Sequence, residues 1–343
     1  MTPTRSPRPA HRPRRPRSRT ADRRRAGSLR WPAGLVRVLF ASLVLAPLAG
    51  LAGCVTNPAT GKQQLNFLSR EQEIALGAEA MPQLVNQYGG EVRGAELRSY
   101  FQRVARELTP HVEEKYRDLP WEFTLLDSDV INAFALPGGK VFVTRGLAAR
   151  MTNEAQLAGV LGHEIGHVTA EHADQRVSRN MMIQLGAVGV SIAAGESDSE
   201  WARAAVPFLI SGAGVFALSY DREEELEADR LGMRYMHRAG YNPIGQLQLM
   251  RILRDAAGNA RQPEFLSTHP HPETRIAKIE EIIEKKYPHA LDGVGGFYEE
   301  RFRSRFLAQL ESLPPAAHRP HADDPDLELA DASTWCAHCR SHH

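Results

Sequence analysis

Five residues near the middle of the chain, His163-Glu164-Ile165-Gly166-His167, have the types and the spacing of a metal site. Two histidines four residues apart on a helix lie on one face, about one turn from each other, so both imidazoles can reach one zinc ion. Glu164 is rotated by about 100° from His163, which keeps its carboxylate off the metal and lets it hold a water molecule. The motif predicts a hydrolytic zinc site, and a helix that matches the pattern by chance is the alternative.

Two histidines do not complete such a site, because catalytic zinc usually has three protein ligands and a water molecule. The acidic segment 223–229 supplies candidates for the third ligand. Glu225 and Glu227 are two residues apart, so on a helix their side chains point about 200° from each other and only one can face the metal. A solvated acidic helix is the alternative for this segment taken alone.

With both segments in this order, the chain resembles the HtpX-like zinc metalloproteases, a gluzincin family that includes the CAAX prenyl endoprotease. In that family an H-E-x-x-H helix is followed some tens of residues later by E-x-x-A-D, which matches residues 225–229. The resemblance assigns the third zinc ligand to Glu225. It also matches Asp229 to a carboxylate behind the ligands, which could accept the N–H of a ligand histidine and fix its tautomer. Three neighbouring acids are then expected to be dispensable: Glu223, Glu224 and Glu227.

Two further segments extend this resemblance to roughly residues 54–287. Residues 132–139 look like the family's strand and turn before the active-site helix, and residues 266–270 with Arg275 look like its late threonine-histidine-proline signature. We expect an extended substrate to pair with an edge strand formed by Asn132, Ala133, Phe134 and Ala135. Because such pairing reads the backbone, it favours unfolded or misfolded polypeptides over one defined sequence.

His269, in the late signature, has three candidate roles. It could be a structural histidine that is hydrogen-bonded at a helix start. It could occupy the fourth zinc position and block the enzyme until substrate displaces it. It could instead stabilise the oxyanion of the tetrahedral intermediate. The blocking role is favoured, because the resemblance extends to periplasmic members of the family that use the matching histidine in this way.

The predicted fold is α+β: a mainly helical zincin, of the gluzincin type by resemblance, with a small sheet whose exposed edge runs beside the active-site helix. Apolar residues at three- and four-residue spacing, with capping signals, predict helices at 69–80, 92–108, 153–177, 222–238, 242–257 and 273–287. Short apolar runs with turn signals predict strands at 121–126, 130–135 and 141–144. The apolar stretches 181–194 and 201–218 do not reach a clean membrane span, so they are expected to be core helices, with a surface for membranes or unfolded chains as the alternative.

The N-terminal segment predicts export. Residues 1–53 hold twelve arginines and one acid, a net charge of +11. Since the whole chain has a net charge of +1, the rest carries −10, which argues against nucleic-acid binding. An apolar run from Leu35 to Leu51 follows the basic region, as in a secretory signal peptide, and a transmembrane anchor is the alternative. The run ends in residues 51–54, Leu-Ala-Gly-Cys, which resemble a bacterial lipobox and imply a lipid on Cys54.

The predicted organisation is a signal peptide (1–53), a tether (54–68), a zinc metallopeptidase domain (69–290) and a flexible C-terminal extension (291–343). Too few residues follow Tyr287 for the tetratricopeptide-repeat domain that one branch of the family carries. Cys336 and Cys339 in the extension are expected to form an incidental disulfide or to bind metal weakly.

Together these features predict a zinc endopeptidase with one Zn²⁺ per chain, held by His163, His167 and Glu225. Its expected partners are unfolded envelope proteins as substrates and a membrane, through the lipid on Cys54. The expected location is the periplasmic side of a bacterial membrane. Val55 after the cysteine indicates the outer membrane by resemblance to bacterial lipoproteins. The alternative function is a zinc-binding, chaperone-like lipoprotein whose protease site is latent.

Overall fold

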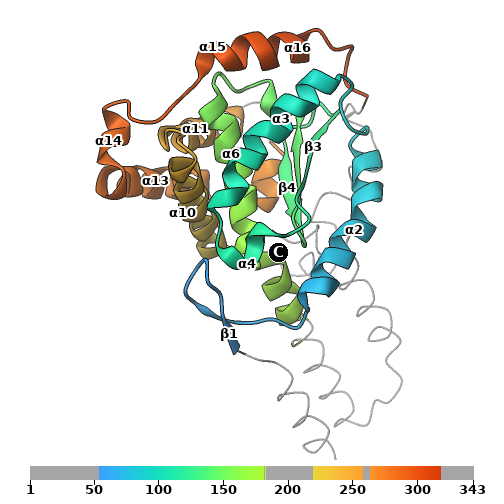
Figure 1. Cartoon of the computed structure of the whole chain (residues 1–343), viewed down its shortest axis with the longest axis vertical. Helices are drawn as coiled ribbons and strands as arrows, with labels where there is room; N and C mark the ends of the chain where they lie inside the picture. Colours follow the sequence, from blue (N-terminus) through green and yellow to red (C-terminus); the bar gives the residue numbers. More distant parts are fainter. Residues whose placement is uncertain (1–53, 181, 183–218, 258–262, 318–343) are drawn as a thin grey trace, which may run out of the picture.

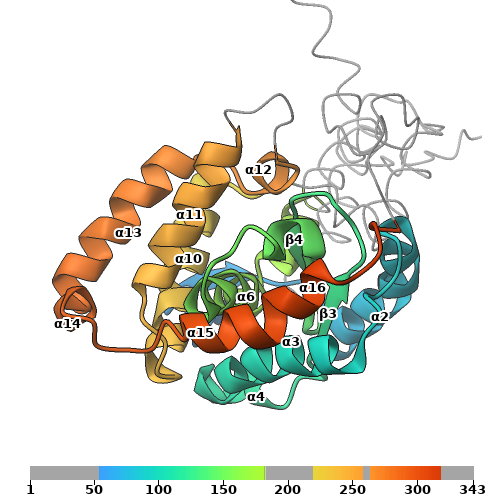
Figure 2. The same cartoon turned by 90° about the horizontal axis from the view of Figure 1, so that it is seen from above.

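A small sheet beside a central helix forms the framework of the molecule (Figures 1 and 2). The computed structural model describes residues 54–180, 182, 219–257 and 263–317. The sheet contains β3 (Glu122–Leu126), β5 (Lys140–Thr144) and β4 (Ala133–Leu136), in that order. β5 is parallel to β3 and antiparallel to β4, so β4 occupies one edge of the sheet as far as the structure describes it.

Helices make up most of the described chain, so the predicted α+β fold is confirmed. The long helices are α2 (Arg70–Gln87), α3 (Ala95–Leu108), α6 (Glu154–Thr169), α10 (Arg222–Arg238), α11 (Ile244–Ala257) and α13 (Pro272–Lys286). The short ones are η1 (Thr109–His111), α4 (Glu114–Arg117), α5 (Arg145–Ala148), α12 (Phe265–Thr268), α14 (Pro288–Leu291), α15 (Glu299–Phe302), η2 (Arg303–Leu307) and α16 (Ala308–Glu311). Residues 172–180 form a further helix.

The helix that carries the two histidines is shorter than predicted. α6 ends at Thr169 and not near residue 177, because Glu171 adopts a left-handed backbone conformation with φ of 58° and turns the chain. The buried Glu171 carboxylate holds this turn by accepting a hydrogen bond from the hydroxyl of Tyr116 at 3.1 Å. The turn points His172 back toward His167, which the site below uses.

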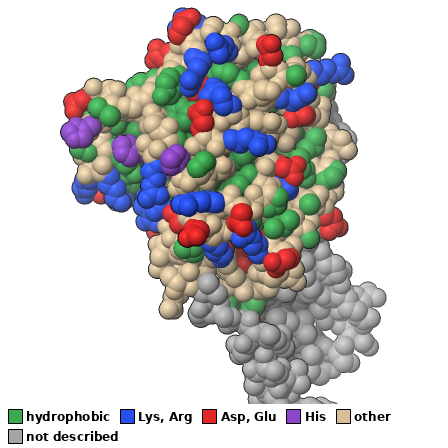
Figure 3. Space-filling view, viewed as in Figure 1, with side chains coloured by type: hydrophobic (Ala, Val, Ile, Leu, Met, Phe, Trp, Pro, Cys, Tyr) green, Lys and Arg blue, Asp and Glu red, His purple; other side chains and the backbone are tan. Residues whose placement is uncertain are grey.

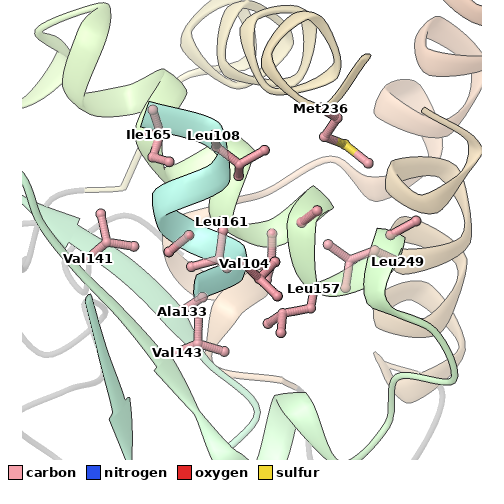
Figure 4. Close-up of a cluster of buried hydrophobic side chains, with 14 of the residues drawn as sticks. Val104, Leu108, Ala133, Val141, Val143, Leu157, Leu161, Ile165, Met236 and Leu249 are labelled. Atoms are coloured by element: carbon pink, nitrogen blue, oxygen red, sulfur yellow. The ribbon is translucent and has the colours of Figure 1, made fainter. Parts of the chain in front are cut away.

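α6 is the core of the domain. Every residue of α6 except Val168 is buried, as expected for a helix that is surrounded on all sides. On one side its apolar side chains contact α3 and the sheet, and on the other side they contact α10 and α11 (Figure 4). The side chains labelled there are Val104, Leu108, Ala133, Val141, Val143, Leu157, Leu161, Ile165, Met236 and Leu249.

The segment predicted as a tether folds against the domain instead. β1 (Cys54–Thr56) pairs antiparallel with β2 (Gln63–Leu65). Between them, the fully buried side chain of Asn57 donates hydrogen bonds to the Tyr116 hydroxyl and to the carbonyl of Thr169, both at 3.0 Å. A buried amide that is satisfied in this way fixes the hairpin on the body of the protein.

The start of the predicted flexible extension is also part of the body. Its helices α15, η2 and α16 lie across one end of the molecule, beside α3 (Figure 1, orange to red). Phe302 and Phe306 are fully buried, and Arg301 forms an ion pair with Glu154 at the first turn of α6. The domain therefore continues past residue 290, because these aromatic side chains complete the core.

Several predicted features lie outside the described residues. These are the signal peptide of residues 1–53, most of the two apolar stretches at 181–218, and residues 318–343 with Cys336 and Cys339. In the part that is described, no helix has both the length and the apolar character needed to cross a membrane. Acidic and basic side chains are interspersed over the face shown in Figure 3.

Candidate active site

α6 presents the two histidines of the motif. The helix starts at the N-cap Asn153, whose side chain accepts a hydrogen bond from the backbone N–H of Gln156 at 3.0 Å. His163 and His167 lie one turn apart near its other end, and their Nε2 atoms are only 3.1 Å apart. Both side chains are almost fully buried.

α10 brings the third ligand candidate to the histidines. Asp221 and Glu224 form a capping box at its N-terminus, which fixes where the first turn begins. Glu225 lies in that first turn, where the positive end of the helix dipole favours a carboxylate. Its Oε1 is 3.3 Å from His167 Nε2, and its Oε2 is 3.5 Å from His163 Nε2.

Glycines let α6 and α10 approach closely enough for this contact. A Cβ atom added to Gly166 would lie 2.8 Å from the carbonyl oxygen of Ala228, and one added to Gly232 would lie 2.8 Å from the backbone of Gly162. Real Cβ atoms essentially never come so close to backbone. Glycine at these positions therefore lets the two helix backbones come into direct contact.

His269 completes the cluster from the other side. It follows α12, and its Nδ1 atom is 3.3 Å from His163 Nε2 and 2.8 Å from Glu225 Oε1. Its ring stacks on Phe265, with centroids 4.3 Å apart, and on Tyr220, with centroids 5.0 Å apart. A hydrogen bond of 2.9 Å from the backbone N–H of Tyr220 to the carbonyl of Thr268 joins these segments. The imidazole is thus held in place on both faces.

The donor atoms of this cluster suit one zinc ion. Four ligand atoms placed tetrahedrally at the usual Zn–N and Zn–O distances are about 3.3 Å from one another. Five of the six pairs lie 2.8 to 3.5 Å apart, counting either oxygen of Glu225. With one atom from each residue, all four lie within 4.8 Å of one another. His163, His167, Glu225 and His269 are therefore a chemically fitting ligand set.

Asp229 lies behind His163, as the resemblance implied. Its Oδ1 is 2.9 Å from His163 Nδ1, so it can accept that N–H and leave Nε2 free for a metal. Arg275 and Gln246 hold the same carboxylate through hydrogen bonds of 2.7 to 2.9 Å. Burial and Arg275 lower the pKa of His163, but hydrogen bonds to Asp229 and Glu225 outweigh them and raise it to about 9. The negative surroundings that favour a proton there would also favour a zinc ion.

His172 plays the corresponding part behind His167. The Nδ1 atoms of the two rings are 2.9 Å apart, and His172 Nε2 is 3.4 Å from Glu227 Oε2. For His167 to offer Nε2 to a metal, its Nδ1 must carry the proton and donate it to His172. His172 then donates from Nε2 to Glu227. Glu227 thus faces away from the metal position, as the helical angle predicted, and supports a ligand indirectly. Burial lowers the pKa of His167 well below its usual value and keeps it neutral.

Glu164 has the surroundings of a general base. Its side chain is fully buried, yet neither carboxylate oxygen has a hydrogen-bond partner among the described residues. Burial raises its pKa above the ordinary value, which brings it nearer to neutral pH. The His269 ring lies beside it, with Nε2 3.7 Å from Glu164 Oε1. An unpaired buried carboxylate of this kind is poised for a water molecule or a substrate.

The predicted substrate strand coincides largely with β4. Ala133, Phe134 and Ala135 lie in the strand, and α6 packs beside it. Asn132 precedes the strand, and its buried side chain donates to Glu264 at 2.8 Å and to the Tyr88 hydroxyl at 3.1 Å. Its backbone N–H and carbonyl are bonded to Thr144, so residues 133–135 are the part of the predicted segment that lies in the edge strand.

Comparison with known proteins identifies the family. The family model described as Peptidase family M48 matches residues 92–283, more than half of the chain. The chain belongs to peptidase family M48. The beta-barrel assembly-enhancing protease of Escherichia coli K12 is 30% identical over 285 residues, which cover 79% of this chain and 56% of that protein. The mitochondrial metalloendopeptidase OMA1 of Schizosaccharomyces pombe is 28% identical over 229 residues, which cover 66% of this chain and 65% of that protein.

The match confirms that the chain belongs to the metalloprotease family that its motifs predicted. The human mitochondrial metalloendopeptidase OMA1 is 27% identical over 244 residues, 66% of this chain and 45% of that protein. The chain thus spans about half the length of several curated relatives that it matches. The range matched by the M48 model contains all four candidate ligands, and also Glu164 and Asp229.

The structure adds residues of the M48 site that sequence reasoning missed. His172 supports His167, Tyr220 stacks on His167 with centroids 3.7 Å apart, and Arg275 balances Asp229 and Glu225. Arg275 had been noted only as part of a signature. For His172 the available signal was its place five residues after His167. Tyr220 precedes the acidic helix and carries no such signal.

Proposed function

We propose that this chain is a zinc endopeptidase that cleaves unfolded or misfolded polypeptides in the bacterial cell envelope. One observation carries the proposal. The donor atoms of His163, His167 and Glu225 are spaced for one ion, and the unpaired carboxylate of Glu164 is buried beside them. The name of the Escherichia coli relative supports a role among envelope proteins.

In the proposed mechanism the chain's own residues bind the substrate and move the proton. When bound, zinc would polarise the scissile carbonyl and make the attacking water more acidic. Glu164 takes the proton of that water and passes it to the leaving amine. Asp229 and His172 keep the two ligand histidines in the tautomer that frees Nε2. Arg275 offsets the negative charge of Glu225 and Asp229.

The substrate is proposed to lie extended along β4. Within the described chain this strand pairs on one side only, with β5, so its other side is free to add a peptide strand. The hydrogen bonds of such an arrangement go to the backbone, and a folded protein cannot offer them. This mode accounts for a preference for unfolded chains without a fixed recognition sequence.

A second function, a zinc-binding, chaperone-like protein with a latent protease site, also has an observation in its favour. His269 Nδ1 lies 3.3 Å from His163 Nε2 and 2.8 Å from Glu225 Oε1, close to the separation of two ligands of one zinc ion. A fourth protein ligand there would occupy the position of the water molecule. We favour a reversible version of this state, in which His269 closes the enzyme until substrate displaces it. The visible spectrum of the cobalt-substituted protein, with and without a peptide, would distinguish permanent from reversible coordination.

The location of the protein is proposed from its N-terminal sequence. A lipid on Cys54 would hold the mature chain on the periplasmic side of the outer membrane. Replacing Cys54 with Ser should either release soluble protein into the periplasmic fraction or leave the protein unprocessed. Retention of a processed C54S protein in the membrane would instead point to the apolar stretches at 181–218 as the anchor.

The activity is tested by changing the base and a ligand separately. Glu164→Gln should keep stoichiometric zinc but lower hydrolysis of an unfolded protein by roughly 10²- to 10⁴-fold, the usual contribution of a general base. Glu225→Gln should lose both zinc and hydrolysis, while Glu223→Gln, an exposed acid on the same helix, should change neither. Near-normal turnover by the Glu164→Gln protein would show that the proposed mechanism is wrong.

A further inference from the structure

A narrow pocket leads from the metal site toward α2, and its far wall is acidic. It is lined by Ala135 at the end of β4, by His167 and Tyr220, and by Glu73, Glu171 and Asp174. It is a narrow space that is partly open to solvent. Since a ligand histidine and the end of the edge strand both line it, a peptide lying along β4 could place one of its side chains there.

The negative charge of this pocket is only partly balanced. Glu171 is satisfied: it forms an ion pair with Lys115 and accepts hydrogen bonds from Tyr116, Gln64 and Asn66. The guanidinium of Arg176 also lies 3.6 Å from the centroid of the Tyr220 ring. Asp174 is almost fully buried. Its Oδ1 accepts hydrogen bonds from Ser178 and from the backbone of Leu68, whereas its buried Oδ2 has no hydrogen-bond partner among the described residues. The pocket therefore contains a buried carboxylate oxygen that a ligand could satisfy.

Glu73 adds a second carboxylate on the α2 side. Within the described part of the chain it forms no ion pair or hydrogen bond. Burial, with repulsion from Glu171 and Asp174, raises its pKa to about 8. Burial likewise raises the pKa of Asp174 to about 6. A cation in the pocket would relieve this repulsion.

The spacing of these acids does not suit a metal ion. Among the described residues, only one group of three or more potential metal ligands has its donor atoms within 4.8 Å of one another. That group is His163, His167, Glu225 and His269. An arginine or lysine side chain differs from an ion in two useful ways. It has several N–H donors that can reach separate carboxylates, and an aliphatic stem that can pack against Ala135.

We propose that this pocket is a subsite for a basic side chain of the substrate. The peptidase should then prefer chains with arginine or lysine at one fixed distance from the cleaved bond. This inference rests on the proposed function, because it needs a peptide on β4. It narrows the substrate from any unfolded chain to one with a positive charge at a defined place.

The test uses nonapeptides of one background sequence that carry a single arginine, or a single citrulline, at each position in turn. Citrulline has the shape of arginine without its charge. The zinc-loaded wild type should cleave the arginine peptide roughly 10- to 100-fold faster, as kcat/KM, at one position, which is the range of one or two charge-assisted hydrogen bonds. Glu73→Gln and Asp174→Asn should each reduce this ratio to a few-fold.

Control variants test whether a loss of charge preference is specific to the pocket. Glu79→Gln removes an exposed acid from the same helix, six residues beyond Glu73, and should leave the ratio unchanged. Asp174→Asn keeps Oδ1 for Ser178 and Leu68, and Glu73 is only partly buried, so neither change should unfold the protein. A wild type that cleaves the peptides without any charge preference, or a preference that survives both pocket variants, would overturn the proposal.

The failure of the protease proposal gives a different result. If the wild type cleaves none of the peptides, their binding to the zinc-loaded protein is measured by fluorescence anisotropy. Tighter binding of one arginine peptide than of its citrulline partner, lost in Glu73→Gln, would support the pocket and reject the protease. Equal binding of both sets would reject the pocket as well.

Discussion

At the scale of single residues, the site depends on how each ligand is held from behind. His163 is oriented by Asp229, and His167 is oriented by His172, which in turn meets Glu227. Two histidines of one helix thus have different supports, an acid in one case and a second histidine in the other. Both supports leave Nε2 facing the shared position, which is what a metal requires.

His269 gives the most informative test at this scale. If it closes the enzyme, His269→Ala should raise peptidase activity, by about 10-fold where the open state is a minor one. Zinc content should stay at one per chain, because His163, His167 and Glu225 remain. Activity on an unfolded protein and zinc content are measured together. The control is His271→Asn, which changes an exposed histidine two residues away and keeps a residue that tolerates its left-handed backbone.

The opposite outcome identifies the other role. If His269 stabilises the oxyanion, the same variant should lose about 10²-fold in turnover with zinc retained. Such a loss would reject the closing role. In the structure the Nδ1 atom of His269 is directed at the ligand cluster, while Nε2 faces Glu164, which is why we expect the increase.

At the scale of elements, the site depends on the close packing of α6 against α10. Glu225 and Asp229 reach the two histidines only because the helix backbones nearly touch at Gly162, Gly166 and Gly232. Any side chain at these points would separate the helices. Glycine normally weakens a helix, so its presence here shows that close approach matters more than helix propensity.

Gly232→Ala tests this balance through the sign of its effect. Helix propensity alone predicts a more stable protein, by roughly 1 kcal/mol. The added Cβ would lie 2.8 Å from backbone atoms of Gly162 and His163, so we expect a loss of about 1–3 kcal/mol instead, the usual cost of overpacking. Zinc affinity should fall as well. Urea unfolding and zinc titration measure the two effects, and a rise in stability would contradict the packing argument.

At the scale of the whole molecule, the two ends of the described chain fasten the active-site helix. The hairpin β1–β2 is anchored through Asn57 at the last residue of α6, and α15 is anchored through Arg301 at its first turn. The domain is therefore larger than the segment between its motifs. Residues far from the metal site contribute to keeping α6 in place.

Phe306→Ala tests the contribution of the C-terminal helices. The side chain is fully buried in the main core, so its loss should destabilise the protein by about 3–5 kcal/mol. Arg305→Ala, at the exposed neighbouring position, should change stability by less than about 0.5 kcal/mol. Thermal or urea unfolding of the zinc-loaded protein measures both. Similar stabilities for the two variants would show that this segment is dispensable for the fold.

Short-range features of this protein could be predicted from its sequence. The two histidines of the motif share a face because helical geometry places residues four apart together, and the cap at Asn153 follows from neighbouring side chains. The bounds of α10, residues 222 to 238, were predicted correctly. The helical angle also showed that Glu225 and Glu227 cannot face the same point. Each of these depends on residues within one or two turns.

The tertiary structure decided everything that joins distant parts of the chain. The pairing of His172 with His167 needs the left-handed turn at Glu171, and local periodicity had predicted a helix running through it. Glu73 and Asp174 are about a hundred residues apart, yet they line one pocket. The burial of Phe306 depends on a core assembled from several elements. Sequence periodicity reports which face of an element is apolar, but it does not report which other element covers that face, because that choice depends on the packing of the whole molecule.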